Sequence, residues 1–182
     1  CVSIFGSART KPEHPAYAMA TEIAAKLSHA GYGVITGGGP GIMEAANQGA
    51  KEAKGKSVGL NIKLPFEQHA NIYIDFDKLL DFDYFFVRKV MFMKFAQGFI
   101  VMPGGLGTLD ELFEALTLAQ TNKLAKFPIV LVGSYFWNGL IDWIKQAMLE
   151  NDKYISPEDT NLFKIVDTAD EAVAVIIDFY AK

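Results

Sequence analysis

Cysteine and histidine are scarce in this chain, which has one cysteine, Cys1, and three histidines among 182 residues. A single cysteine excludes a disulfide within the chain and is typical of a reducing compartment, so we expect a cytoplasmic protein. The histidines, His14, His29 and His69, are far apart and lack the spacing of metal ligands. We therefore expect no metal site and no bound cofactor.

An excess of positive charge is also missing, because the formal net charge is −4 and the sequence pI is about 5.4. Without a basic stripe we expect no nucleic-acid partner, and a small anionic ligand would need a local positive pocket. No apolar run is long enough to span a bilayer and no signal peptide is present, so no membrane association is expected. The chain opens at Cys1 without an initiator methionine, and we expect the natural chain to extend upstream.

Apolar side chains are abundant, at 51% of the residues, and 14 phenylalanines add bulk, which suits one domain spanning residues 1–182. Hydrophobic periodicity predicts strands that alternate with helices. The predicted strands cover residues 2–5, 32–36, 57–62, 72–76, 99–102, 128–132 and 162–166, and the predicted helices cover 13–30, 42–54, 82–97, 109–121, 136–150 and 168–180. This order predicts an α/β protein, a Rossmann-like three-layer sandwich with a mostly parallel central sheet and helices on both faces.

Glycine-bearing turns follow three of the predicted strands, at residues 6–7, 37–41 and 104–107. In a parallel sheet, ligands bind at the carboxyl ends of the strands where the strand order switches, so we expect these turns to meet in one crevice. Residues 103–111, Pro-Gly-Gly-Leu-Gly-Thr-Leu-Asp-Glu, have the layout of a phosphate cradle, a glycine backbone leading into a helix N-terminus. The alternative is a plain turn with a capping box between Thr108 and Glu111.

The glycine turns do not match the two common nucleotide-binding fingerprints. The first strand is not followed by the G-x-G-x-x-G spacing, and the turn at 104–107 lacks the Lys-Ser/Thr pair of a P-loop. Hydride transfer by a dehydrogenase and ATP hydrolysis are therefore disfavoured.

Two charged residues stand out in the predicted helices. Arg88 shares a helical face with Phe85 and Phe92, where a guanidinium needs either a ligand anion or a carboxylate in the core or at a subunit interface. Glu111 points away from the apolar stripe of its own helix, so it can face a ligand that lies over the glycine turn.

Four further polar residues have both a functional and an ordinary interpretation. Ser7 and Arg9 could offer a hydroxyl and a charge to a phosphate, or be a turn serine and a surface arginine. Thr117 fits helix packing but could also line the pocket, and Lys89 could be a solvated lysine.

The stretch 103–111 resembles the PGGxGTxxE signature of the LOG ("lonely guy") family. Arg88 and Lys89, upstream of it, are similar to the family's Arg-Lys pair, and residues 37–43 are similar to its second glycine loop. The resemblance runs from about residue 2 to residue 132. It implies a phosphoribohydrolase, typically dimeric, that splits a nucleoside 5′-monophosphate into free base and ribose 5-phosphate. Members have often been labelled lysine decarboxylases, a chemistry for which no lysine in an apolar pattern offers support.

The resemblance implies a role for each matching residue. Arg88 and Glu111 would be the catalytic pair of an N-glycosidic hydrolase. The substrate, a purine nucleoside monophosphate, would be bound by the phosphate loop and by residues around it, namely Ser7, Gly38, Gly39, Glu67, Lys89, Gly104, Gly105, Leu106, Gly107, Thr108 and Thr117.

The substrate base and the presence of turnover both have alternatives. Residues 5–9, Phe-Gly-Ser-Ala-Arg, depart from the Cys-Gly-Ser-Ser form of plant members, which favours AMP over a cytokinin precursor, an N6-substituted AMP. The alternative function is a carrier on the same fold that holds a nucleotide or phosphorylated cofactor without cleaving it. The apolar helix at 82–97 also predicts a subunit contact, with a homodimer as the expected assembly.

Overall fold

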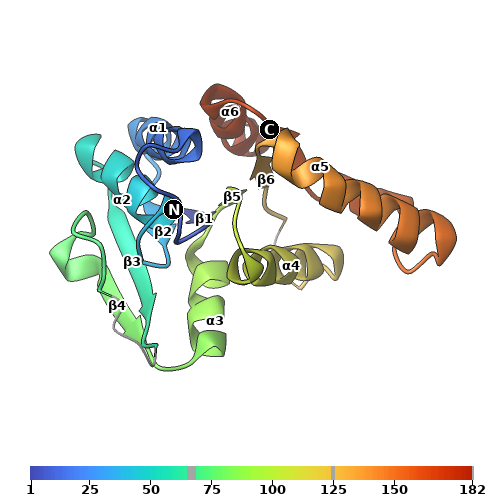
Figure 1. Cartoon of the computed structure of the whole chain (residues 1–182), viewed down its shortest axis with the longest axis horizontal. Coiled ribbons are helices and arrows are strands. Elements are labelled where there is room, and N and C mark those ends of the chain that lie inside the picture. The colour runs from blue at the N-terminus through green and yellow to red at the C-terminus, as the bar shows by residue number, and fades with distance from the viewer. Residues whose placement is uncertain (65–68, 124–125, 182) are drawn as a thin grey trace.

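The computed structural model describes residues 1–64, 69–123 and 126–181. Its centre is a seven-stranded sheet in the order β4-β3-β2-β1-β5-β6-β7, and all six pairings are parallel (Figure 1). The strands are β1 Val2–Phe5, β2 Val34–Thr36, β3 Ser57–Ile62, β4 Leu79–Phe82, β5 Phe99–Val101, β6 Ile129–Val132 and β7 Lys164–Val166. The direction of strand order reverses between β1 and β5, which is where such a sheet forms a crevice.

In the described residues, six α-helices cover the sheet, as the alternating pattern predicts. They are α1 Pro15–His29, α2 Ile42–Glu52, α3 Phe85–Phe95, α4 Leu106–Gln120, α5 Ser134–Trp143 and α6 Ala169–Tyr180. Within the part of the chain that the structure describes, no helix is both long and apolar enough to cross a membrane.

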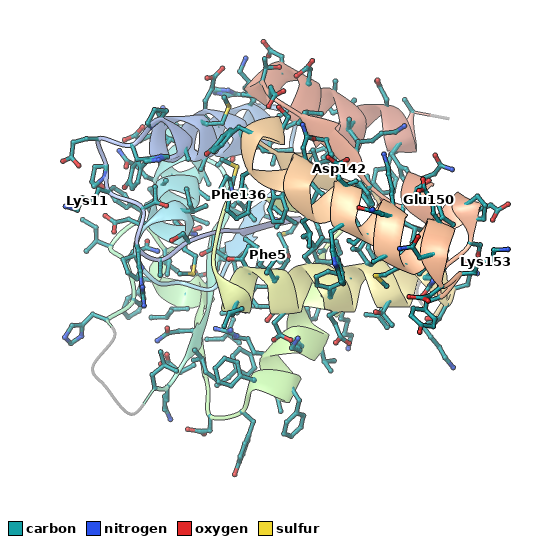
Figure 2. The ribbon with its side chains drawn as sticks, turned by 45° about the vertical axis from the view of Figure 1, so that its right-hand side comes forward. Phe5, Lys11, Phe136, Asp142, Glu150 and Lys153 are labelled. Atoms are coloured by element: carbon teal, nitrogen blue, oxygen red, sulfur yellow. The ribbon has the colours of Figure 1, made fainter. Side chains whose placement is uncertain are left out.

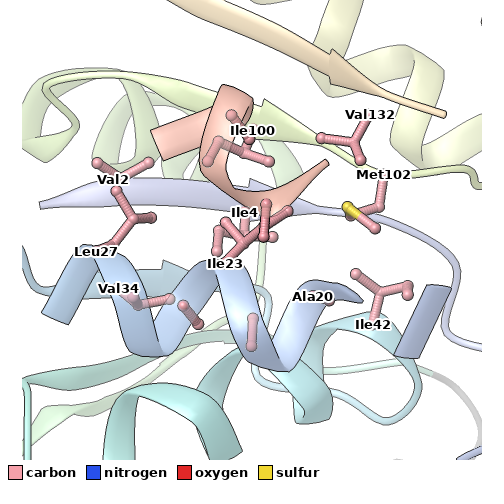
Figure 3. Close-up of a cluster of buried hydrophobic side chains, with 14 of the residues drawn as sticks. Val2, Ile4, Ala20, Ile23, Leu27, Val34, Ile42, Ile100, Met102 and Val132 are labelled. Carbon is pink, nitrogen blue, oxygen red and sulfur yellow. The ribbon is translucent and has the colours of Figure 1, made fainter. Parts of the chain in front are cut away.

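Two apolar cores form because successive residues of a strand point to opposite faces of the sheet. Val2 and Ile4 of β1 pack under α1, α2 and α6, where Ile23 and Leu27 are fully buried (Figure 3). Phe5 points to the other face and joins the core under α3, α4 and α5. The sandwich therefore has three layers, and its two helical layers enclose the ends of β1 and β5.

Local signals explain several helix boundaries. Helix α1 starts with Pro15 at its first position and is followed by Gly31 at φ +88°, the left-handed conformation expected of a helix stop. Helix α6 is capped by Thr168, whose hydroxyl and backbone N–H exchange hydrogen bonds with Glu171.

One predicted strand is wrong. Residues 72–74 form a turn, and the fourth strand is β4, which begins at Leu79. Asp75 prevents the earlier pairing, because its N–H donates to the Ser57 carbonyl and its carboxylate accepts from the Ser57 N–H at 3.1 Å. These two bonds hold Asp75 beside Ser57, the first residue of β3. The chain then forms the short 3-10 helix Phe76–Lys78, and β4 begins directly after it.

Three helix boundaries also differ from the prediction. Helix α3 starts at Phe85 because residues 79–82 belong to β4, and helix α4 starts at Leu106, three residues earlier than predicted. Helix α5 ends at Trp143 and continues as the π-helix Ile144–Asn151, which Figure 2 follows past exposed Asp142 and Glu150. The connection after it contains the 3-10 helix Pro157–Asn161.

The outer face of α3 is apolar and exposed. Phe86, Val90 and Phe95 each expose half or more of their surface. Such a face suits the expected subunit contact, and the homodimer stays a prediction.

Candidate functional site

A cavity of about 600 Å³ opens where the strand order switches, at the carboxyl ends of β1 and β2 and the N-terminus of α4. Turns 6–9 and 105–107 line it, together with Gly37 of the second glycine loop, so all three predicted turns contribute. Helix α3 supplies Phe85, Arg88 and Phe92 to the wall. The lining residues are Phe5, Gly6, Ser7, Ala8, Arg9, Gly37, Met43, Ile62, Leu64, Phe85, Arg88, Phe92, Gly105, Leu106, Gly107, Thr108 and Glu111.

The N-terminus of α4 forms the open side of the cavity. Gly105 is the residue before the helix and no side chain caps it, so the N–H groups of the first turn have no intrahelical partner. A Cβ atom at Gly105 or Gly107 would meet no heavy atom within 4 Å, and both residues are exposed. The capping box, which was the alternative to a phosphate cradle, is not formed between Thr108 and Glu111, because Thr108 lies inside the first turn. The turn is therefore free to bind an anion.

Gly104 has a different part in the same turn. It does not line the cavity, and a Cβ atom there would overlap the Thr108 side chain. Gly104 therefore allows Thr108 to pack under the turn, where Thr108 is buried.

Arg88 and Glu111 face each other at the inner end of the cavity. One Arg88 Nη atom lies 3.9 Å from a Glu111 carboxylate oxygen, and only 13% and 6% of the two side chains are exposed. Within the described residues, the buried atoms Nε of Arg88 and Oε2 of Glu111 have no hydrogen-bond partner. The guanidinium also lies 5.2 Å from the centre of the Phe85 ring. Sequence analysis left two interpretations of Arg88, a partner for a buried carboxylate and a residue that faces a ligand. Both describe this geometry, because Arg88 lies beside Glu111 and lines the cavity.

Burial shifts the pKa of both charged groups. It raises the pKa of the Glu111 carboxyl above its usual range, although the charges of Lys89 and Arg88 oppose the shift. Burial also lowers the pKa of the Arg88 guanidinium, with Glu111 as the main opposing charge. Glu111 is therefore a stronger base than an exposed glutamate, and Arg88 lacks the hydration it would have in water. An anionic ligand would satisfy Arg88.

The second glycine loop contributes less than predicted. Gly37 lines the cavity, whereas Gly38 and Gly39 are buried and do not. The carbonyl oxygens of Gly38 and Gly39 accept hydrogen bonds from Asn71, at 3.2 and 3.0 Å from its Nδ2. The carbonyl groups of Gly38 and Gly39 are therefore occupied by Asn71, and a substrate contact of either residue stays a prediction.

Two other predicted site residues lie outside the cavity. Lys89 points along α4, with Nζ 2.8 Å from a carboxylate oxygen of Asp110 and 3.8 Å from one of Glu114. Thr117 is exposed, and its hydroxyl donates to the Phe113 carbonyl of the same helix at 2.7 Å. It does not line the cavity. Glu67 lies outside the described residues.

Ser7 and Arg9 both line the cavity. The Ser7 hydroxyl accepts a hydrogen bond from the Arg9 N–H at 3.0 Å. The Arg9 side chain is exposed, so its charge can reach a ligand that enters.

Sequence reasoning missed the apolar wall of the cavity. This wall includes Phe5, Met43, Ile62 and Leu64. Phe5 and Ile62 are the last residues of predicted strands, and that position could have identified them, because ligands bind at the carboxyl ends of parallel strands. These side chains form an apolar surface beside the charged pair, and a flat apolar group could pack against it.

The sheet order and the position of the cavity define a Rossmann-like α/β protein with its site at the topological switch point. The family model described as "Possible lysine decarboxylase" matches residues 43–176. The chain belongs to this family, the LOG family.

Two curated relatives agree with this assignment, and a solved structure shares the fold. The cytokinin riboside 5′-monophosphate phosphoribohydrolase of Mycobacterium tuberculosis is 31% identical over 157 residues, 85% of this chain and 82% of the relative. The protein of the same name from Mycobacterium marinum is 29% identical over 89% of this chain and 86% of the relative. The molybdenum cofactor carrier protein of Chlamydomonas reinhardtii shares the fold, with a TM-score of 0.69, 21% identity and coverage of 100% of this chain and 98% of that chain.

Proposed function

We propose that this protein hydrolyses the N-glycosidic bond of a purine nucleoside 5′-monophosphate, AMP or an N6-substituted AMP. Water adds to C1′ of the ribose, the bond from C1′ to the base nitrogen breaks, and the base leaves with the bonding electrons and takes up a proton. The observation that carries this proposal is the buried Arg88–Glu111 pair, with its unpartnered Nε and Oε2 atoms, beside an uncapped helix N-terminus. The names of the relatives support the same reaction.

The phosphate of the substrate would bind the first turn of α4. The N–H groups of Leu106, Gly107 and Thr108 belong to this turn, and the helix dipole favours a negative charge there. Binding energy from the phosphate would hold the ribose over Glu111, five residues further along the same helix.

Glu111 would act on the ribose side of the bond. Cleavage builds positive charge on the sugar, as in glycoside hydrolysis, and a buried carboxylate stabilises that charge. With its pKa raised by burial, Glu111 is also suited to take a proton from the attacking water.

Arg88 would act on the nucleotide from the opposite side. Its guanidinium, between Glu111 and the Phe85 ring, can orient the nucleotide and stabilise negative charge on the departing base. The apolar wall at Met43 and Ile62 would accept the flat face of the purine.

Product analysis tests this proposal. The purified protein is incubated with AMP and, separately, with isopentenyladenosine monophosphate, and free base and ribose 5-phosphate are measured by chromatography. We expect Glu111→Ala to lower kcat by about 10²- to 10⁴-fold, with nucleotide affinity changed only a few-fold. Asp110→Ala is the matched control, because Asp110 is the neighbouring acid but pairs with Lys89 outside the cavity.

The outcomes separate the two candidate functions. Free base from the wild type and from Asp110→Ala, but not from Glu111→Ala, supports the hydrolase, and the ratio of the two rates identifies the preferred base. A nucleotide that binds without release of base rejects the hydrolase and favours the carrier. Equal kcat for wild type and Glu111→Ala would remove Glu111 from the mechanism.

A further inference from the structure

Asn71 holds the second glycine loop from outside the loop. Its backbone N–H donates to the Gly38 carbonyl at 2.9 Å, and its side-chain Nδ2 lies 3.2 Å from the same oxygen and 3.0 Å from the Gly39 carbonyl. Two consecutive peptide groups of the loop therefore have their carbonyl directions fixed by one residue. Because a trans peptide is planar, this also fixes the direction of the Gly39 N–H.

A buried polar network supports Asn71 from below. The Asn71 Nδ2 also lies 2.9 Å from Oδ1 of Asn47, which is fully buried in α2. The same Oδ1 accepts from the Thr36 hydroxyl at 2.6 Å, and that hydroxyl in turn accepts from the Gly38 N–H at 3.0 Å. The loop is thus held from both sides, and its glycines at φ +76° and +69°, Gly38 and Gly41, allow this path.

The held loop reaches the charged pair through Gly37. A Cβ atom at Gly37 would lie 3.7 Å from Nη1 of Arg88 and 2.8 Å from Sδ of Met43. The Gly37 backbone therefore lies beside the guanidinium, close enough that a Cβ atom at Gly37 would touch it. Besides Gly37, the guanidinium contacts Glu111 at 3.9 Å and the rings of Phe85 and Phe92, and its Nε has no hydrogen-bond partner in the described part of the chain.

We propose that Asn71 is a positioning residue that sets the place of the Arg88 guanidinium through the Gly38–Gly37 backbone. Asn71 does not line the cavity and acts through the loop. The expected loss of kcat rests on the proposed function, whereas the expected movement of the Arg88 guanidinium does not. Loss of the Asn71 amide lets the loop move, and the guanidinium loses its fixed position relative to Glu111.

The expected kinetic effect is on turnover. The phosphate would bind α4, which the network does not touch, so nucleotide affinity stays within about twofold. Misplacement of a catalytic group by a fraction of an ångström costs rate, and we expect Asn71→Ala to lower kcat by about tenfold. Asn71→Ser, which keeps one donor near the carbonyls, should lower it by about threefold.

Ser57→Ala is the matched control. Ser57 belongs to the same network, since its hydroxyl accepts from Asn47 Nδ2 at 2.9 Å, but it lies below the loop at the start of β3. It should reduce stability while kcat stays within about twofold of the wild type. Equal loss of kcat in Ser57→Ala and Asn71→Ala, or unchanged kcat in Asn71→Ala, would overturn the proposal.

A second measurement needs no turnover. In ¹H–¹⁵N NMR spectra, the buried Arg88 Nε–H gives a separate signal that Arg88→Lys assigns by removing it. We expect Asn71→Ala to shift or broaden this signal and that of the Gly37 amide, and Ser57→Ala to leave both in place. If the wild type releases no base but the Arg88 signal responds to Asn71→Ala, the hydrolase proposal fails and the positioning proposal stands. If the position and width of the Arg88 Nε–H signal are unchanged in Asn71→Ala, the positioning role is rejected.

Discussion

Helices α2 and α4 both begin after a glycine loop, and each buries a polar residue at the same position of the helix. Each follows a glycine loop at the carboxyl end of a strand, and each buries a polar side chain at its sixth residue, Asn47 in α2 and Glu111 in α4. Asn47 is neutral, and its Oδ1 and Nδ2 both have hydrogen-bond partners. Glu111 titrates, and its Oε2 has no partner among the described residues. The two equivalent positions therefore differ in hydrogen bonding: the Asn47 amide is satisfied, whereas Glu111 keeps a free oxygen among the described residues that the proposed function would use.

The glycines of the loops before α2 and α4 differ in the space around them. Gly41 has φ +69°, and a Cβ atom there would overlap the backbone of Ser7 and Ala8. Gly105 and Gly107 have open space where a Cβ would be. Gly41 is needed so that the chain can pack, whereas Gly105 and Gly107 lie where a ligand can approach the backbone. Motif similarity alone does not separate these two roles, and the surroundings of each glycine do.

Asn47→Asp is the most severe way to test the comparison, because it places a carboxylate where the amide is satisfied. The aspartate loses the two donors to the Ser57 hydroxyl and the Val58 carbonyl and buries a charge. We expect the free energy of unfolding to fall by about 3–5 kcal/mol, measured by urea denaturation. Asn138→Asp on the exposed surface of α5 is the control. A loss below about 1 kcal/mol would mean that the Asn47 site is not a demanding structural position.

Gly41→Ala tests the two loops against each other, with Gly105→Ala as its partner. Alanine at 41 needs a left-handed backbone and overlaps the carbonyl of Ser7. We expect a loss of about 2–4 kcal/mol, made up of backbone strain and displacement of the turn. Gly105→Ala should change stability by less than about 0.5 kcal/mol. Thermal unfolding followed by circular dichroism compares the two variants, and similar losses would show that the loops do not differ in this way.

Local periodicity was enough to predict most of the fold. The helix that ends before Gly31 and the strands β1 and β3 agree with their predicted ranges closely, because each is a strong apolar pattern bounded by glycine or polar residues. The strand at 72–76 was wrong because the fold of that segment depends on a distant contact, the double hydrogen bond between Asp75 and Ser57. An apolar pattern carries no information about such a contact.

The site was predictable where one helix face determined it. Arg88 stands out on an apolar helix face, and the structure brings it together with Glu111. The expected orientation of Glu111, away from the apolar stripe of α4, is wrong, because Glu111 lies on the buried face of that helix with Leu112 and Ala115. Thr117 and Lys89 were assigned to the cavity by motif alone, and the structure gives each a partner on α4 instead. The role of Asn71 was invisible in the sequence, because it depends on the position of two carbonyl groups more than thirty residues away.

The smallest change in stability is expected for Glu111→Gln. This change should depend on pH, because Glu111 titrates and Asn47 does not. Burial raises the pKa of Glu111 in the folded protein. Between the ordinary and the raised pKa, the unfolded chain has released this proton and the folded chain has kept it. Wild-type stability therefore falls as the pH rises through this window and stays lower above it.

Glutamine removes this penalty because it has the shape of the protonated acid and no charge. At mildly alkaline pH we expect Glu111→Gln to raise Tm by about 2–4 °C, the change that about 1 kcal/mol produces in a domain of this size. The difference from wild type should shrink as the pH falls and vanish below the ordinary carboxyl pKa. Glu114→Gln, on the exposed side of the same helix, should show no such rise. If Glu111→Gln is instead less stable at every pH, then the charge of Glu111 is needed to balance Arg88, and α4 resembles α2 in using its buried polar residue for stability.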